Sequence, residues 1–144
     1  MKIFIDSSVV IAALLSPGGG SAQTINFCEI PILDGYISLD VIGEVKEVIE
    51  RKLPGIHKEF EKLLKIASLK VVKKISPPLL RNVKRWLDHP KDAKILAAAK
   101  MAHVDCLVSL DIKHFIKDPR IAEKAQIKIL TPGDFLKFFR KELN

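Results

Sequence analysis

The stretch IFIDSSVVIAALL, residues 3–15, decides the fold. Its first three residues are β-branched or aromatic and predict a short buried strand, while residues 9–15 predict a buried helix. Asp6 stands between the two, where the surrounding pattern predicts apolar packing. Because a buried charge without a partner is costly, we expect Asp6 to face polar groups or a cation.

The whole chain has the size and composition of one domain, residues 1–144. Its hydrophobic fraction of 48% and charged fraction of 28% are ordinary for a globular protein. No apolar run approaches the roughly 20 residues that span a bilayer, and the first residues lack the layout of a signal peptide. We therefore expect a cytoplasmic protein with no membrane partner, in which Cys28 and Cys106 are reduced core thiols.

The net charge of +7 and the isoelectric point near 9.5 favour an anionic partner. Nucleic acid is the usual partner of such a protein. A lysine-rich surface also serves solubility alone, so the charge does not identify the function by itself. The basic residues concentrate in the middle third of the chain, at Lys58, Lys62, Lys65, Lys70, Lys73, Lys74, Arg81, Lys84, Arg85, Lys91 and Lys94.

Predicted strands alternate with predicted helices along the chain. Short apolar runs predict strands at residues 2–5, 35–38, 69–72, 106–109 and 127–130. Helical patterns lie between them, at residues 9–15, 21–29, 56–66, 77–86, 90–102 and 135–143.

A further helix carries apolar residues at 3.6-residue spacing from Val41 to Ile49, with Asp40 as its expected N-cap. The alternation predicts the α/β class, a three-layer α/β/α arrangement around a central parallel sheet of about five strands. The order of the strands is not specified by this pattern.

Four acidic residues from distant parts of the chain are expected at one edge of this sheet. Ligands bind beyond the carboxyl ends of parallel strands, and the helices that follow the strands begin at the same edge. Asp6 and Asp111 directly follow strands, and Glu44 and Asp92 lie near the starts of helices. By the same argument, Asp105 precedes a strand and belongs to the opposite edge.

The helical positions of two of these acids refine the prediction. Asp92 shares its helical face with Ile95, Leu96 and Ala99, so it is expected to point inward. Glu44 lies at the border of the apolar stripe of its helix. Both side chains are therefore expected to reach the crevice at the sheet edge rather than bulk water.

Each acid also has an ordinary structural explanation. Asp92 would complement a helix dipole by itself, Asp6 and Asp111 occupy positions typical of turn and capping residues, and Glu44 alone would be a surface residue. Together, however, four like charges in one crevice repel one another, and a divalent cation resolves that conflict. All-oxygen ligands favour Mg²⁺ or Mn²⁺, as one or two ions.

Serine and histidine residues accompany these acids. Ser7, Ser8 and Ser109 are adjacent in sequence to the acids and are able to donate to a carboxylate or to metal-bound water, or simply to cap the backbone. The histidines are scattered. Two of them, His89 and His114, fall near the predicted edge, where a loop histidine is usually only solvated.

The chain resembles the PIN-domain nucleases over nearly its whole length. The resemblance rests on four segments, FIDSSVVIAALLSPGG (residues 4–19), VIGEVKEVIER (41–51), HPKDAKILAAAKMAHVD (89–105) and CLVSLDIKHF (106–115). Family members usually carry Thr or Ser and often Asn after the first Asp. Here Ser7 and Ser8 fill those places, so the common Asn is absent. The Ser-Pro-Gly-Gly at residues 16–19 is similar to a PIN subgroup described as toxins of toxin–antitoxin pairs.

The resemblance implies a parallel-sheet fold and a metal-dependent ribonuclease that hydrolyses phosphodiester bonds of single-stranded RNA. Asp6, Glu44, Asp92 and Asp111 would then be the acidic quartet that holds Mg²⁺ or Mn²⁺. A toxin would pair with a cognate antitoxin (a VapC-like role), and a homodimer is implied because the family commonly dimerises. The alternative is a catalytically silent PIN module that acts as a scaffold for RNA or protein.

Two other folds that place Asp after the first strand fit less well. Dehalogenases require a second Asp two residues on, where Ser8 stands. Receiver domains require a phosphate-accepting Asp after the third strand, where Lys73 and Lys74 stand.

Overall fold

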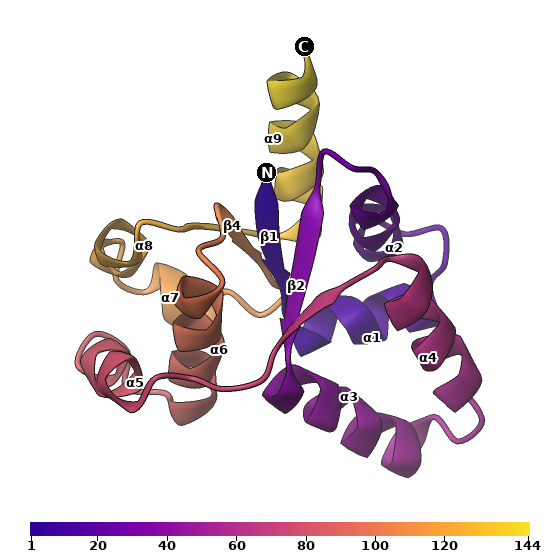
Figure 1. The fold of residues 1–144 in the computed structure, drawn as a ribbon, viewed down its shortest axis with the longest axis horizontal. Coiled ribbons are helices and arrows are strands. Elements are labelled where there is room, and N and C mark those ends of the chain that lie inside the picture. Colours follow the sequence, from indigo (N-terminus) through magenta and orange to yellow (C-terminus); the bar gives the residue numbers. More distant parts are fainter.

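Strand β1 (Lys2–Ile5) lies at the centre of a five-stranded parallel sheet in the computed structural model, which describes residues 1–144. It pairs with β2 (Asp34–Ser38) on one side and with β4 (Cys106–Val108) on the other. β3 (Lys70–Val72) and β5 (Lys128–Leu130) form the two sheet edges, which gives the order β3-β2-β1-β4-β5 (Figure 1). The central position explains why residues 3–5 are completely buried.

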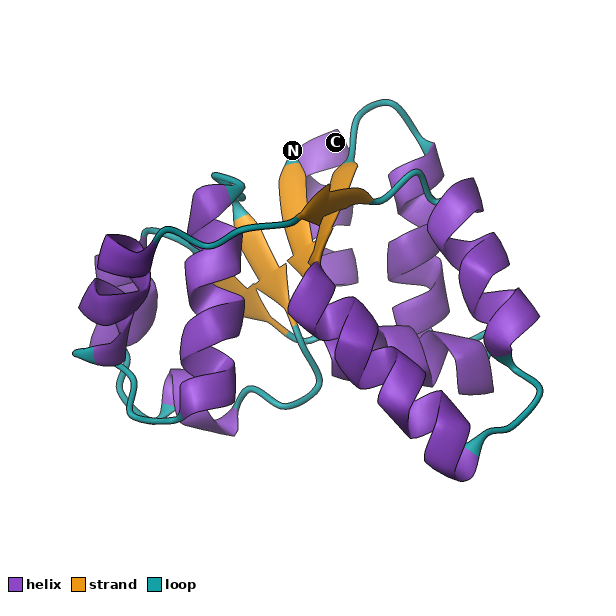
Figure 2. Cartoon of the chain, turned by 60° about the horizontal axis from the view of Figure 1, so that its bottom comes forward, coloured by secondary structure: helices purple, strands orange, loops and turns teal.

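Helices cover both faces of the sheet (Figures 1 and 2). One face carries α1 (Ser7–Leu15), α2 (Gly20–Asn26) with a 3₁₀ turn (Phe27–Glu29), α3 (Leu39–Lys52), α4 (His57–Ile66) and α9 (Pro132–Leu143), which packs on α2. The other carries α5 (Pro77–Lys84), α6 (Pro90–Met101), α7 (Lys113–Ile116) and α8 (Arg120–Ala125). Right-handed crossovers require this division, because the chain runs from β1 outward to β3 and then returns past β1 to β4 and β5.

The predicted three-layer α/β/α architecture is therefore confirmed, with each strand within about two residues of its predicted bounds. The predicted cap of α3 is wrong. Ser38 is the N-cap, because its Oγ accepts a hydrogen bond from Val41 N at 3.2 Å, and Asp40 lies inside the first turn. Helix α9 begins earlier than predicted, at Pro132, with Thr131 as its N-cap. The short helices α7 and α8 were not predicted, since four and six residues are too few to display a helical period.

The core contains 35 buried hydrophobic residues from all three layers. Cys28 and Cys106 are among them and form no disulfide. Burial raises the pKa of Cys28 to about 12 and that of Cys106 to about 11, which keeps both thiols neutral at physiological pH. They are core residues rather than nucleophiles. None of the helices has the length and hydropathy needed to traverse a membrane.

The strand order reverses between β1 and β4, because the connections that follow these neighbouring strands lead to opposite sides of the sheet. Such a reversal opens a crevice at the carboxyl ends of the strands. Backbone hydrogen bonds extend the ladder into it, with Asp6 N donating to Val108 O at 3.1 Å and Ser109 N donating to Leu130 O at 3.0 Å. The residues after β1 and β4 are thereby fixed side by side.

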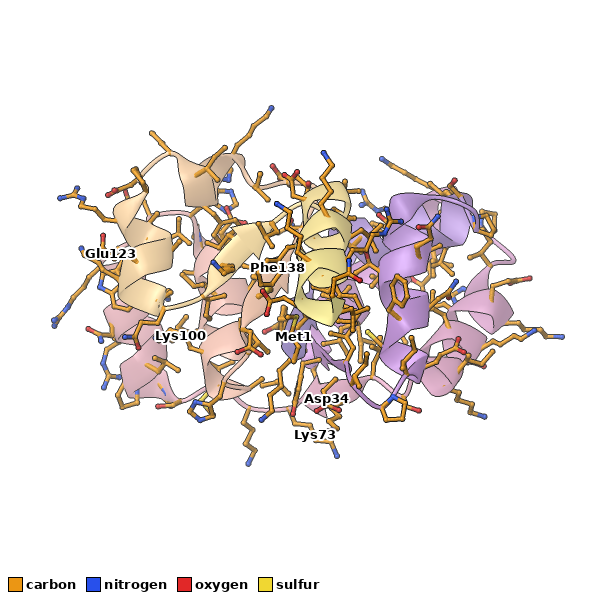
Figure 3. The ribbon with its side chains drawn as sticks, turned by 90° about the horizontal axis from the view of Figure 1, so that it is seen from above. Met1, Asp34, Lys73, Lys100, Glu123 and Phe138 are labelled. Atoms are coloured by element: carbon orange, nitrogen blue, oxygen red, sulfur yellow. The ribbon has the colours of Figure 1, made fainter.

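The amino ends of the strands lie at the opposite edge, which Figure 3 shows with Met1 and Phe138 near its centre. Asp105 lies at this edge, as predicted, and its Oδ2 accepts a hydrogen bond from Lys2 N at 2.8 Å. Its carboxylate therefore caps the start of β1 and takes no part in the crevice.

Candidate functional site

Asp6 is the N-cap of α1 and one of the most enclosed polar residues of the chain, with 6% of its surface exposed. Three serines surround its carboxylate. Ser109 Oγ donates to Oδ2 at 2.6 Å, Ser8 Oγ donates to the same oxygen at 3.3 Å, and Ser7 N donates to Oδ1 at 2.7 Å. The serines that follow β1 and β4 thus orient this carboxylate from both strands.

Burial raises the pKa of Asp6 above its ordinary value of 3.8, and the nearby charge of Glu44 raises it further. The hydrogen bonds from Ser109, Ser7 and Ser8 oppose this effect without cancelling it. The ionised carboxylate is therefore held at an energetic cost. A cation in the crevice would remove that cost. The buried Asp6 carboxylate is therefore the feature of the site that fits a metal ion.

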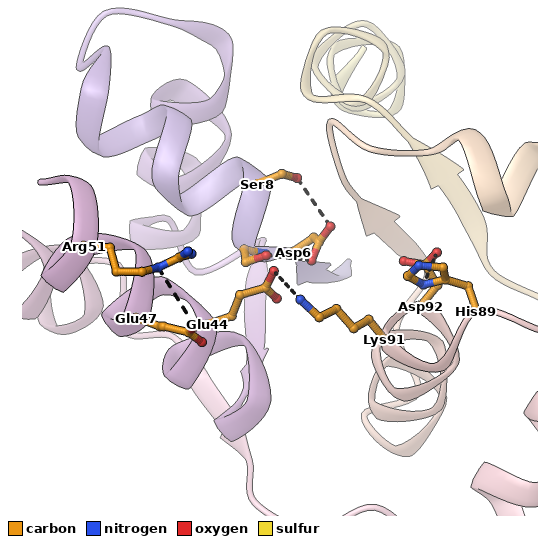
Figure 4. A network of polar contacts seen from close by, with 9 residues as sticks. Asp6, Ser8, Glu44, Glu47, Arg51, His89, Lys91 and Asp92 are labelled. Carbon is orange, nitrogen blue, oxygen red and sulfur yellow. Dashed lines mark hydrogen bonds and ion pairs between the residues drawn. The ribbon is translucent and has the colours of Figure 1, made fainter.

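Glu44 lies in the second turn of α3, half-buried as its position at the border of the apolar stripe predicts. Figure 4 shows Lys91, from the first turn of α6, extending toward Glu44 beside Asp6. The Nζ of Lys91 is 3.9 Å from Glu44 Oε1. A groove of about 210 Å³ between α3 and α6 is lined by these two residues together with Lys94 and Glu47.

Asp111 lies in the loop between β4 and α7, and its side chain is exposed. Its backbone N donates to Ser109 Oγ at 3.0 Å, and the same hydroxyl donates to Asp6. The neighbouring Leu110 N donates to Ser8 Oγ, also at 3.0 Å. The loop that carries Asp111 is therefore tied to Asp6 through its backbone, whereas the Asp111 carboxylate itself accepts no hydrogen bond from the protein.

Asp92 lies in the first turn of α6 and points inward, as predicted, with 7% of its surface exposed. Two imidazoles that the sequence reasoning set aside face its Oδ2. His114 Nδ1 lies 2.6 Å from this oxygen and His89 Nδ1 lies 3.2 Å from it. Both histidines stand at the same sheet edge as the acids, and the strand direction that places the acids there places these two metal-ligating side chains as well.

The three donor atoms of His89, Asp92 and His114 all lie within 4.8 Å of one another, and no other group of three or more His, Cys, Asp or Glu side chains is as close. The four predicted acids lie at the same edge of the sheet but do not form such a close group. Mg²⁺ does not require one, because it usually keeps several waters and takes only one or two carboxylates directly.

The basic residues of the middle third do not form one surface. Those of α4 and those of α5 lie at opposite ends of the molecule in Figure 1. Lys91 and Lys94 alone among them line the groove that contains Glu44. These two lysines are therefore the cations best placed to meet an anion that approaches the acids.

Comparisons with known proteins agree with this fold. A family model described as PIN domain matches residues 2–113. The chain is also similar to a chain in the crystal structure of VapBC2 from Rickettsia felis bound to a DNA fragment from their promoter, with 14% identity and a TM-score of 0.65. That similarity covers 91% of this chain and 98% of the other, and at this identity it supports the fold alone. No curated protein matches the sequence.

The matched segment contains every element that forms the crevice, from β1 and Asp6 to the loop with Asp111. The solved structure independently reproduces the three-layer architecture. With a family model that matches more than half of its length, the chain belongs to the PIN-domain family.

Proposed function

We propose that this protein is a metal-dependent endoribonuclease that hydrolyses phosphodiester bonds of single-stranded RNA. The proposal rests mainly on Asp6, whose carboxylate is buried near Glu44 and whose pKa is raised by that environment. Its position at the reversal of the strand order is the usual place for a ligand in an open α/β sheet. Members of the PIN-domain family are generally nucleases, which agrees with this use of the crevice.

Asp6, Glu44, Asp92 and Asp111 would hold one or two Mg²⁺ or Mn²⁺ ions. Such an ion, when bound, lowers the pKa of a water molecule and offsets the charge of a phosphodiester. The protein supplies orientation and charge. Ser109 and Ser8 hold the Asp6 carboxylate in one rotamer through hydrogen bonds of 2.6 and 3.3 Å.

Lys91 and Lys94 would attract the RNA backbone to the groove beside Glu44. In the absence of substrate, the Lys91 ammonium lies near Glu44 and lowers the repulsion between that carboxylate and Asp6. A phosphate that enters the groove would compete for this lysine. The positive net charge of the chain adds a general attraction for nucleic acid that decreases with salt.

We further propose that the protein is the VapC-like toxin of a toxin–antitoxin pair, with a cognate antitoxin as its partner and a homodimer as its assembly. Support comes from the Ser-Pro-Gly-Gly at residues 16–19 and from the structural relative, which was solved as a VapBC2 complex. The antitoxin would block access of RNA to the crevice.

The test is cleavage of a pool of total RNA by the purified protein with Mn²⁺ or Mg²⁺, followed by mapping of the cut ends. Asp6→Asn should lower metal-dependent cleavage by more than about 100-fold, the upper end of the loss seen when only an outer-shell partner of a metal is removed. Glu50→Gln, which removes an exposed charge from α3, is the matched control and should cleave normally. Undiminished cleavage by Asp6→Asn would show that Asp6 is not part of the active site.

Calorimetric titration with Mn²⁺ distinguishes the enzyme from a silent PIN scaffold. The proposal expects wild-type protein to bind Mn²⁺ and Asp6→Asn to bind it more weakly. Absence of any heat at millimolar metal, together with absence of cleavage, would favour the scaffold.

A further inference from the structure

His89, Asp92 and His114 form a cluster, and the proposed nuclease uses its carboxylate but neither of its histidines. The acidic quartet offers only oxygen ligands, whereas this cluster contributes two imidazole nitrogens and one carboxylate oxygen. The imidazole rings are stacked, with centroids 4.4 Å apart and planes inclined by 15°, so that both Nδ1 atoms face Asp92 Oδ2.

The contacted oxygen has no hydrogen bond. Asp92 Oδ2 is fully enclosed, the whole side chain is 10% exposed, and this oxygen accepts no hydrogen bond even though two imidazole nitrogens lie close to it. Two nitrogens at 2.6 and 3.2 Å from a carboxylate oxygen repel it if they present lone pairs. Because an unpaired buried carboxylate oxygen is costly, the arrangement calls for a cation shared by the three side chains.

The backbone around His89 supports a role other than helix capping. His89 occupies the N-cap position of α6 but makes no capping hydrogen bond with its side chain, and it lies just before Pro90, which restricts its backbone to an extended conformation. Ser, Thr, Asp or Asn would stabilise this position better. The side chain turns instead to Asp92, three residues later.

The cluster is accessible from solvent. His89 and His114 line a surface cavity of about 740 Å³ that also contains Trp86 and Lys117. The imidazole side chains are 43% and 44% exposed, so an ion would reach them directly from solvent. Once bound, the ion would keep open coordination positions on the side that faces the cavity.

We propose that His89 Nδ1, Asp92 Oδ2 and His114 Nδ1 bind a transition-metal ion of the Zn²⁺ or Co²⁺ type, in a site distinct from the acidic crevice although it shares Asp92 with it. Imidazole ligands favour such ions, whereas Mg²⁺ prefers oxygen. Since His114 is three residues after Asp111, the ion would also hold the loop that carries Asp111 against α6.

The test is titration of the metal-free protein with Co²⁺, followed by its visible absorbance, and with Zn²⁺ by calorimetry. Wild type should bind one equivalent with the absorbance of nitrogen-ligated Co²⁺. His89→Gln and His114→Gln should each weaken binding at least about tenfold, the lower end of the loss seen even for outer-shell partners. His57→Gln, at an exposed position of α4, is the matched control and should bind as wild type does.

Asp6→Asn separates this site from the proposed active site, because Asp6 lies outside the cluster and its replacement should leave the absorbance of nitrogen-ligated Co²⁺ unchanged. Equal Zn²⁺ affinity in wild type, His89→Gln and His114→Gln would overturn the inference, as would the absence of Zn²⁺ binding by folded wild type. Failure of wild type to cleave RNA would remove the proposed function and leave the metal titration unaffected.

Discussion

Asp6 and Asp92 are two carboxylates at one sheet edge, with 6% and 7% of their surfaces exposed, and they are stabilised in different ways. Asp6 receives hydrogen bonds from serines that follow β1 and β4. Asp92 faces two imidazoles, and its enclosed oxygen has no hydrogen bond. Equal burial therefore does not imply equal chemistry, because hydroxyl donors orient the Asp6 carboxylate, whereas no protein donor satisfies the enclosed oxygen of Asp92.

Asp92→Asn should have the largest effect, because Asp92 belongs to both the acidic crevice and the histidine cluster. We expect a loss of RNA cleavage of more than about 100-fold and, in the same variant, at least about tenfold weaker Zn²⁺ binding. Asp6→Asn should lose cleavage only. Kinetics with RNA and calorimetry with Zn²⁺ measure the two effects.

The exposed Asp134→Asn, in α9, is the control for the loss of one carboxylate and should change neither measurement. If Asp92→Asn lost cleavage but bound Zn²⁺ normally, the two carboxylates would be equivalent and the contrast between them would be wrong.

Ser109→Ala tests the serine side of the comparison. Its hydroxyl donates to Asp6 at 2.6 Å and accepts from Asp111 N, so its removal frees both the carboxylate and the loop. We expect a decrease of about 10–100-fold in Mn²⁺ affinity or in cleavage. Ser8→Ala is the matched variant and should lose less, because its hydroxyl donates to Asp6 over a longer distance, 3.3 Å. Larger losses in Ser8→Ala would contradict the assigned roles.

The stability of Asp6→Asn should depend on pH in a direction fixed by the raised pKa of Asp6. The folded state favours the protonated carboxyl, so its contribution is fully present below the unfolded value of 3.8 and is lost as pH rises through the folded pKa. In EDTA, Asp6→Asn should therefore match wild type near pH 3 and exceed it at pH 7. We expect a higher Tm for Asp6→Asn than for wild type at pH 7, and in a domain of this size each kcal/mol of difference corresponds to roughly 2–4 °C.

Thermal unfolding from pH 3 to pH 8 measures this difference, and added Mn²⁺ should reverse it, because wild type gains more stability from binding than the variant does. A wild type that is more stable than Asp6→Asn at pH 7 without metal would show that the serine hydrogen bonds outweigh burial.

The placement of the acids could be predicted because strand direction alone decides it. Asp6 and Asp111 had to follow strands, and Asp105 had to precede one, whatever the strand order. The inward position of Asp92 followed from helical spacing with Ile95 and Leu96. Short helices such as α7 have too few residues for such a periodic pattern in the sequence. The sequence also does not specify that Ser38 rather than Asp40 is the N-cap of α3, because this depends on the side-chain rotamer.

By itself, the sequence determined the three-layer class, the edge of the sheet at which the acids lie and the need of Asp6 for polar partners. It did so because hydrophobic period and strand direction are local properties of the chain. Only the tertiary structure decided that the order reverses between β1 and β4, that Ser109 meets Asp6 across 103 residues, and that His89 and His114 stack beside Asp92. These contacts depend on which strands are neighbours, and nothing in the local pattern specifies that.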